Sequence, residues 1–268
     1  MKAKSIWLAT TLMITLLFAL GYALNGSSTL GQDTDGLTLE VQPDQSSYLP
    51  GEMIALRFRV MNTSSTSISV GSESTVWDGN LKVFIAYEDG PFKEYFGPGW
   101  GTKDRVAGQP VSLAQGQTFE TEATILWNHK VETSHLNPAY AKDISEKRLN
   151  TDYALTKSGT YSIKAVLNNI QTGNKVESAP VVITVEEPQG EDLEVWKKIK
   201  EDANYGLLIQ TGGLAEQPKG PKTTRIAVEL EEILSRHPNS RYSKDIRSGL
   251  TKRQNALKAL DPDKQLDE

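Results

Sequence analysis

The stretch LTKSGTYSIKAVL, residues 155–167, carries the pattern that decides the fold of this chain. After a Ser-Gly turn, apolar residues occupy every second position, at Tyr161, Ile163, Ala165 and Leu167. A period of two places these four side chains on one face of an extended segment. The stretch therefore predicts a β-strand with one buried face, entered through a tight turn.

Similar strand-like stretches lie on both sides of this one. They are residues 37–41, 54–60, 66–70, 81–87, 111–127 and 176–185. Short strands of this number, separated by turn residues, are typical of an antiparallel β-sandwich, which we predict over residues 37–187. Trp77 and Trp127 are assigned to its core, and Trp127 in particular continues an alternating set that should face inward.

The segment from Leu155 to Tyr161 resembles the tyrosine corner of immunoglobulin-like and fibronectin type III-like sandwiches. In those families the tyrosine hydroxyl bonds back to upstream backbone, which implies a structural role for Leu155, Gly159 and Tyr161. Residues 37–64 are similar to the first two strands of bacterial domains of this type. The resemblance implies an exported bacterial sandwich protein, and it implies a fold rather than an activity.

The N-terminus has the layout of an export signal. Lys2 and Lys4 precede residues 6–24, which contain no charge. Residues 1–24 are therefore predicted to be either a cleaved signal peptide or a retained membrane anchor, which places the protein in the periplasm or outside the cell. Residues 25–36 are small and polar and predict a flexible spacer.

The C-terminal part changes from strand to helix spacing after residues 186–192, EEPQGED. Residues 191–260 predict a small bundle of three helices, and residues 261–268 a disordered tail. The stretch EILSRHPNSRYSKDI, residues 232–246, resembles the junction between tetratricopeptide-like helices. That resemblance implies a protein partner, although a second copy of the repeat is lacking.

Composition argues against several functional classes. The net charge of −5 provides no basic field for nucleic acid, and the lack of cysteine removes disulfides, thiolate ligands and thiol nucleophiles. GxSxG and HExxH motifs are missing, and the glycine-rich residues 97–103 have Gly-Thr-Lys in the wrong order for a phosphate loop. We therefore expect no cofactor and no small-molecule ligand.

Two of the three histidines lie in LWNHKVETSHLNPAY, residues 126–140. On a helix His129, Glu132 and His135 would fall at about 0°, 300° and 240°, and on a strand the glutamate would face away from both histidines. Only an irregular loop, predicted over residues 128–154, could bring all three to one metal ion. We therefore interpret them mainly as solvated loop residues and keep the three as weak metal-ligand candidates.

A second candidate is the aromatic cluster in GPFKEYFGPGWG, residues 90–101. Tyr95, Phe96 and Trp100 could form an exposed platform that binds sugars or peptide side chains. The competing interpretation is that the loop folds over the end of the sandwich, so that its aromatic side chains cover the core.

These observations favour a non-catalytic binding or structural module of the cell envelope that engages a protein partner. One alternative is a protease inhibitor that presents residues 89–110 or 128–154 from the sandwich. A second alternative is a hydrolase that uses the loop histidines.

Overall fold

The computed structural model describes residues 31–32, 36–70, 80–98, 111–168, 173, 175–214 and 218–260. The predicted signal or anchor, Trp77, Trp100 and the predicted tail lie outside the described residues. Within the described residues, no helix combines the length and the apolar character that crossing a membrane requires.

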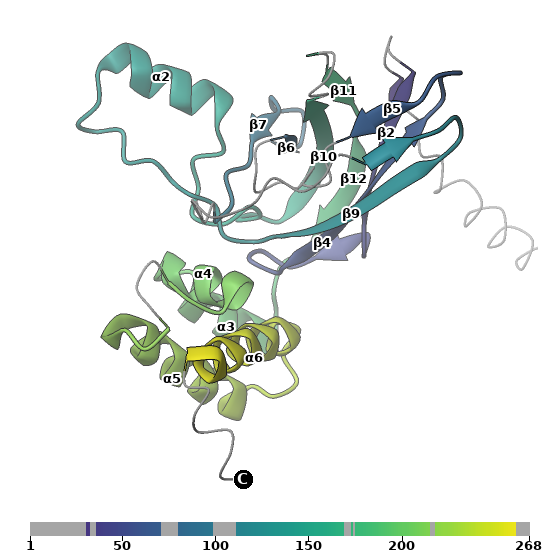
Figure 1. Cartoon of the computed structure of the whole chain (residues 1–268). Helices are drawn as coiled ribbons and strands as arrows, with labels where there is room; N and C mark the ends of the chain where they lie inside the picture. Colours follow the sequence, from purple (N-terminus) through teal and green to yellow (C-terminus); the bar gives the residue numbers. More distant parts are fainter. Residues whose placement is uncertain are drawn as a thin grey trace, which may run out of the picture.

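Two large β-sheets and one small sheet form the upper part of the molecule in Figure 1. The strands are β1 Gly31–Gln32, β2 Leu37–Pro43, β3 Ser47–Tyr48, β4 Ile54–Asn62, β5 Ile68–Val70, β6 Leu81–Tyr87, β7 Lys93–Glu94, β8 Val111–Leu113, β9 Thr118–Ile125, β10 Gly159–Asn168, β11 Lys175–Glu177 and β12 Val181–Val185. One sheet has the order β1-β2-β4-β9, a second has the order β3-β12-β10-β6-β7 with β11 beside β10, and β5 pairs with β8. Strand β1 lies inside the segment that the sequence analysis assigned to a spacer.

Alternation of buried and exposed residues explains why these segments form strands. In β4 the apolar side chains at positions 54, 56, 58 and 60 are buried, whereas Arg57 and Arg59 are exposed between them. Buried side chains from both large sheets belong to a single hydrophobic cluster, which includes Phe58 of β4 and Ile163 of β10. The two sheets therefore share one core. Their pairing is antiparallel except for β3, which lies parallel to β12.

The Tyr161 side chain is buried and its hydroxyl bonds to backbone upstream of it. It is 4% exposed, and its hydroxyl donates to the Lys157 carbonyl oxygen at 3.1 Å. The turn before it needs glycine, because Gly159 has φ +138 and an added Cβ would lie 2.9 Å from the Tyr87 ring. Leu155 is buried in the same core.

Five helices are described: α2 Pro138–Lys147, α3 Gly190–Ile199, α4 Ala203–Thr211, α5 Pro221–Arg236 and α6 Tyr242–Leu260. Helices α3 to α6 form the lower part of the molecule in Figure 1, below the ends of β4 and β9. We call residues 31–185 the strand region and residues 190–260 the helical region. The predicted order, β-sheets followed by a helical C-terminal part, is present in the structure.

The prediction of three C-terminal helices is wrong, because the helical region contains four. The apolar stripe from Leu193 to Ala203 suggested one helix, but the chain breaks after Ile199 and Asp202 caps a new helix by accepting from Asn204 N. Helix α4 escaped the sequence analysis because every residue from Tyr205 to Gln210 is buried, which leaves no one-sided stripe to detect.

The prediction of an irregular loop over residues 128–154 is also wrong in part, because α2 occupies its centre. Asn137 caps this helix by accepting from Ala139 N, and Pro138 stands in its first turn. Asparagine followed by proline is a common helix start, so the pair indicated a beginning of regular structure rather than an irregular backbone. Figure 1 shows α2 held away from the sheets on two connecting segments.

Candidate functional site

The junction between the strand region and the helical region combines polar contacts with apolar packing between segments that lie far apart in the chain. A second hydrophobic cluster fills the helical region, and it also contains Leu49, Leu126 and Tyr153 from the strand region. The Tyr153 hydroxyl donates to the Ile199 carbonyl oxygen at 2.7 Å, and a Cβ on Gly206 would lie 2.5 Å from the Tyr153 ring. The two regions are therefore packed together rather than joined only by the connecting chain.

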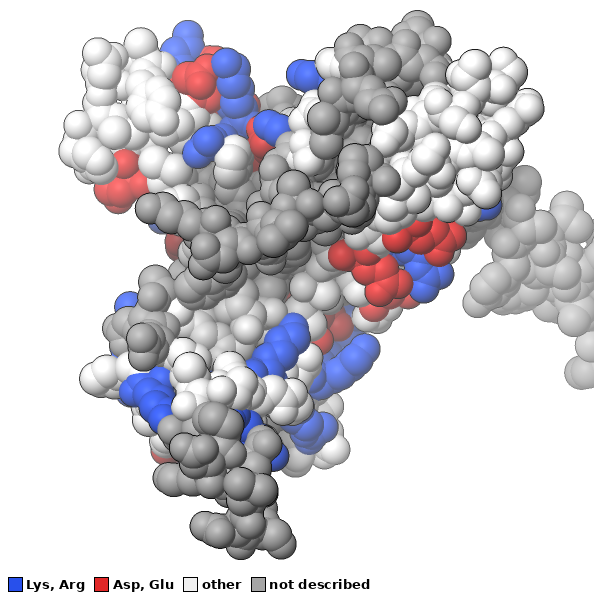
Figure 2. Space-filling model, in the orientation of Figure 1, with Lys and Arg blue, Asp and Glu red and all other residues white. Residues whose placement is uncertain are grey.

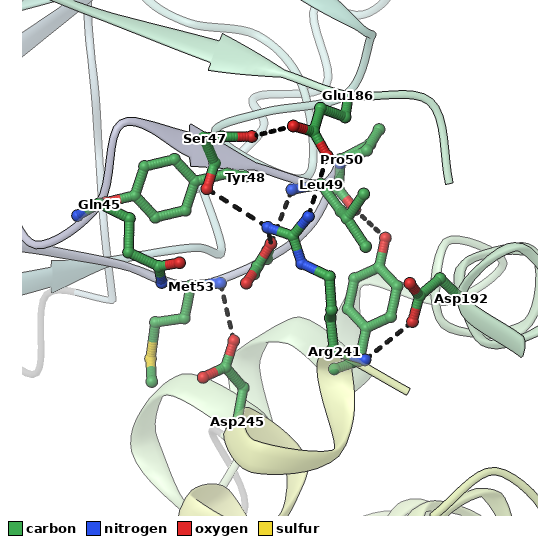
Figure 3. Close-up of polar contacts among 12 residues, drawn as sticks. Gln45, Ser47, Tyr48, Leu49, Pro50, Met53, Glu186, Asp192, Arg241 and Asp245 are labelled. Atoms are coloured by element: carbon green, nitrogen blue, oxygen red, sulfur yellow. Dashed lines mark hydrogen bonds and ion pairs between the residues drawn. The ribbon is translucent and has the colours of Figure 1, made fainter. Parts of the chain in front are cut away.

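Arg241, immediately before α6, is the centre of the junction in Figure 3. Its guanidinium lies 3.0 Å from a Glu52 carboxylate oxygen and 3.1 Å from a Glu186 carboxylate oxygen. It also donates to the Ser47 carbonyl oxygen at 3.3 Å. The Glu52 side chain is only 8% exposed, so this ion pair is largely removed from water on one side. The Arg241 side chain thus binds two positions of the strand region and Glu186, which follows directly after it.

Further contacts fix the start of α6 against the turn that contains Gly51. The Tyr242 hydroxyl donates to the Pro50 carbonyl oxygen at 2.7 Å, and an Asp245 carboxylate oxygen accepts from Met53 N at 3.0 Å. Gly51 has φ +70, and an added Cβ would lie 2.2 Å from the Trp196 ring. The tight approach of this turn to α3 and α6 therefore requires glycine.

Helix α4 makes a second polar contact with the strand region through Gln210, at the end of β9. Its side-chain nitrogen donates to the Thr124 carbonyl oxygen at 2.6 Å, and its side-chain oxygen accepts from Trp127 N at 2.8 Å. The same nitrogen donates to the Tyr95 hydroxyl at 3.1 Å, and that hydroxyl donates to the Trp127 carbonyl oxygen at 2.8 Å. Among the described strands, β9 is the last of its sheet, so Gln210 takes the place of a neighbouring strand there.

Burial controls the protonation of the two carboxyl groups inside the junction. Desolvation raises the pKa of Glu52, although the Leu49 backbone N–H and Arg241 oppose that shift. Desolvation also raises the pKa of Asp245 above its ordinary value of 3.8, opposed by the hydrogen bond from Met53 N. The exposed Glu186 differs, because the hydrogen bond from the Ser47 hydroxyl lowers its pKa. The junction therefore holds two carboxylates in surroundings that disfavour their charge.

Asp245 gives a testable pH dependence. Because its folded-state pKa is raised, the folded chain binds a proton in a window above the unfolded pKa, and its charged form destabilises the fold at higher pH. We expect Asp245→Asn, which can still accept from Met53 N, to raise the free energy of unfolding by about 1 kcal/mol at pH 8. The gain should disappear as the pH falls through the raised pKa. Urea unfolding of both proteins between pH 8 and pH 4.5 measures it.

The groups that face Asp245 are Asp44, Lys244 and Lys252, and these are unchanged in the variant. A stability difference that is constant over the whole pH range would contradict a raised pKa at Asp245. Glu52 lines the same hollow and Asp245 contributes to its raised pKa, so the comparison is repeated in a Glu52→Gln background, which removes this second titration.

Two hollows lie on the outside of the junction and share Asp44 and Ala55 in their linings. The first, of about 100 Å³, lies between the strand region and α6, and its lining includes Glu52, Arg241 and Lys244. The second, of about 310 Å³, continues over the outer face of β2, β4 and β9, with Arg57 and Glu122 in its lining. We call the two together the junction groove. It is open and lined by charges of both signs.

Tyr95, predicted for an exposed aromatic platform, is buried. It is 3% exposed, and its hydroxyl takes part in the Gln210 contact, so it belongs to the junction instead. Phe96 is half-buried beneath the Arg148 guanidinium, which lies 3.7 Å from its ring centroid. Trp100 lies outside the described residues. The platform interpretation is therefore wrong for Tyr95, and the alternative, in which these aromatics cover the core, applies to it.

Trp127 was predicted to face the core between the sheets, and that prediction is wrong. β9 ends at Ile125, so the alternation no longer applies two residues later. The Trp127 side chain is half-buried and packs against the hydrophobic cluster of the helical region instead. It also forms an edge contact with the His129 ring, at 5.7 Å between centroids.

The weak metal-ligand candidates His129, Glu132 and His135 are all exposed on the segment before α2. The Glu132 carboxylate accepts from Ser134 N at 3.1 Å, and this bond lowers its pKa. In the part of the chain that the structure describes, no group of three or more histidine, aspartate and glutamate side chains is arranged to hold a metal ion. His129 N donates to the Phe96 carbonyl oxygen, which ties this segment to the one after β7.

Arg241 and Gln210 were not among the residues predicted from the sequence. Arg241 stands in the stretch that resembled a tetratricopeptide-like junction, but its main partner Glu52 is distant in sequence and follows a turn with no charge pattern. Gln210 lies in an almost wholly buried helix, where a polar residue indicates a specific partner. The signal available in the sequence was a glutamine at the end of the apolar run GLLIQ, residues 206–210.

No protein-family model matches this chain, and no curated protein matches it. Similar solved structures include a sporulation control protein from Bacillus subtilis, with 12% identity, a TM-score of 0.31, and coverage of 62% of this chain and 55% of that one. An alkylpurine DNA glycosylase from Pseudomonas fluorescens bound to DNA has 10% identity and a TM-score of 0.31, over 58% of this chain and 32% of that one. A CARDB domain from Pyrococcus furiosus, solved in complex with metal ions, has 15% identity and a TM-score of 0.28, over 59% of this chain and 95% of that one.

This chain thus spans about half of the first of these proteins and a third of the second. Distant structural neighbours include an immunoglobulin-like CARDB domain, and the described chain combines β-sheets with helices. At these identities and TM-scores the likeness carries no argument about what this chain does. No family is assigned to it.

Proposed function

We propose that this protein is a non-catalytic binding or structural module of the cell envelope that engages a protein partner. In this proposal the strand region is an immunoglobulin-like sandwich, and residues 1–24 export the chain as a signal peptide or hold it to the membrane. The observation that carries the proposal is the junction: Arg241, Tyr242 and Gln210 fasten the two regions into one surface with a shared groove.

The form of the junction groove supports a polypeptide partner. Small-molecule sites are mostly enclosed and apolar, with a few convergent polar groups. The junction groove is instead open, crosses from the sheet face to α6, and alternates positive with negative side chains such as Arg57 and Glu122. Such a surface can meet the backbone and mixed charges of another protein, with water between them at the rim.

The proposal is tested by placing a photo-crosslinking amino acid at Gln42 or Ser248, one on each side of the junction groove, and irradiating intact cells. The matched control is Val228 on α5, which is 49% exposed and outside the groove. We expect one discrete adduct from both groove positions and none from Val228. The same adducts from all three positions, or none from any, would contradict a partner at this groove.

A protease inhibitor remains the second candidate because of α2. Figure 1 shows this helix projecting from the strand region, and Tyr140 on it is 54% exposed. An inhibitor of this kind would engage a protease through the arm that carries α2. A panel of proteases assayed with the full chain and with Tyr140→Ala decides it, since an inhibitor would slow at least one protease and the variant would relieve that inhibition.

A further inference from the structure

The solvent side of α6 carries positive charge near both of its ends, with polar residues between. Lys244, Arg247, Thr251, Asn255 and Lys258 follow one another at spacings of three or four residues, so they lie along one face of the helix. All five are exposed. The row is about 21 Å long at the usual rise per residue. We call these five residues the α6 cationic ladder, and Figure 2 shows Lys and Arg side chains gathered over the helical region.

The cations of the α6 cationic ladder differ from most exposed cations of the other described helices, because they lack ion pairs with carboxylates in the described part of the chain. In α2 and α3 the exposed cations pair with carboxylates three or four residues away, as Lys147 does with Asp143, and in α5 Arg225 and Arg236 do so while Lys222 has no such ion pair within residues 218–260. Within the described residues, no carboxylate lies within ion-pair distance of Lys244, Arg247 or Lys258.

The acidic residue of α6 is unavailable to its ladder. Asp245 is turned inward, accepts from Met53 N and is only 9% exposed. Like charges at helical spacing destabilise a helix by a few tenths of a kcal/mol per pair. A chain of net charge −5 therefore keeps three exposed cations on one helix, although none of them forms an ion pair within the described residues.

We propose that the α6 cationic ladder binds an acidic segment of a protein, which deepens the proposed function by giving the chemistry of the partner and rests on it. Three charges over about 21 Å match carboxylates spaced along a helix or an extended peptide. Thr251 and Asn255 between them offer hydrogen bonds to the same segment. Lys244 also lines the junction groove, so a segment on the ladder continues into the groove.

A protein segment fits the ladder better than a membrane surface or a nucleic acid. Helices that lie on membranes place apolar side chains beside their cations, whereas the residues flanking this ladder are polar, such as Ser248 and Gln254. A nucleic acid presents about one charge per 1.7 Å and calls for a wide basic surface. The net charge of −5 repels such extended polyanions, whereas a short acidic segment experiences mainly the local field of the ladder.

The test measures binding of a fluorescent glutamate-rich peptide of about 16 residues, long enough to follow the ladder as a helix, to the full chain in non-ionic detergent. We expect binding that weakens with salt and that the triple variant Lys244→Glu, Arg247→Glu, Lys258→Glu weakens about tenfold or more, as loss of three surface ion pairs implies. The matched control reverses Lys142, Lys147 and Lys197, which are exposed cations of α2 and α3. It changes the net charge equally and should alter the affinity by less than about twofold.

Several outcomes would overturn the inference. Equal weakening in both triple variants would show that net charge alone acts. Tighter ladder-dependent binding of phosphatidylglycerol vesicles or duplex DNA would assign the ladder to that ligand instead. Peptide binding that appears only after removal of residues 261–268, which hold four acidic residues, would assign it to the chain's own C-terminus.

The proposed function and this inference can fail separately. If groove crosslinking yields its adduct and ladder reversal leaves that adduct unchanged, the binding module stands and the ladder inference falls. If the acidic peptide binds through the ladder but no groove adduct forms, the ladder binds acidic segments and the envelope-partner proposal falls.

Discussion

Replacing Gly249 by alanine is expected to lower the free energy of unfolding by about 2–3 kcal/mol. Gly249 lies in α6, where it faces α4, and an added Cβ would lie 2.5 Å from the Ile209 Cα and 2.9 Å from the Leu208 carbonyl oxygen. Both atoms are backbone, so no side-chain rotation relieves the clash, and α4 must move as a unit. Such overpacking typically costs about 1–3 kcal/mol.

Two opposing contributions determine whether Gly249→Ala stabilises or destabilises the fold. Alanine is favoured over glycine in a helix by about 1 kcal/mol, which opposes the clash. However, Gln210 follows Ile209 in α4, so movement of that helix also disturbs the hydrogen bonds to Thr124 and Trp127, each worth about 1 kcal/mol. The losses together exceed the gain in helix propensity.

Urea unfolding followed by circular dichroism measures the change. The matched control is Gly213→Ala, because nothing lies within 4 Å of a Cβ at that position and the change should stay within about 0.5 kcal/mol. Equal free energies of unfolding for Gly249→Ala and Gly213→Ala would contradict the close approach of α4 and α6 at Gly249.

Replacing Arg241 by methionine should cost a similar amount, about 3 kcal/mol, for an electrostatic reason. The change leaves the Glu52 carboxylate, with its 8% exposed side chain, without its cation. Leu49 N continues to donate to it at 2.7 Å, but one hydrogen bond does not replace the lost ion pair. The same change removes the contacts of Arg241 with Glu186 and the Ser47 carbonyl oxygen.

A double-mutant cycle separates the buried charge from the lost packing. The double variant Arg241→Met, Glu52→Gln should be more stable than Arg241→Met alone, because the uncompensated carboxylate is gone. The penalty of Arg241→Met should also shrink as the pH falls, since burial already raises the pKa of Glu52 and loss of the cation raises it further.

The control for this cycle is Arg236→Met in α5, whose ion pair with Glu232 is exposed on both sides. Exposed pairs contribute at most about 1 kcal/mol. Equal costs for the Arg241 and Arg236 changes would mean that the junction ion pair is not a buried interaction.

Strand positions could be predicted from the sequence because apolar and polar residues alternate along a strand that has one buried face. The alternation in β4 and in β10 is local information, and so is the turn before Tyr161, where Gly159 must adopt φ +138. Each of these features depends on neighbours within a few residues. These strands and this turn therefore lie close to the positions predicted for them.

The junction could not be predicted in the same way, because its contacts join positions far apart in the chain. Glu52 pairs with Arg241 and Gln210 binds Thr124, and neither pair leaves a local pattern. The burial of Tyr95 could not be predicted either, because it also depends on a distant part of the chain. Its neighbours suggested an exposed aromatic cluster, whereas a hydrogen bond from α4 explains why it is buried.

The side-chain amide of Gln210 has a consequence for solubility. An edge strand with unpaired backbone groups is a template on which another chain can add a strand, and such additions lead to aggregation. At the end of β9, the Thr124 carbonyl oxygen and Trp127 N are already occupied by Gln210, and Leu126 N is 3.4 Å from the Tyr95 hydroxyl. The helical region thus shields that end of the sheet from self-association, and a strand region produced without residues 190–260 is expected to aggregate.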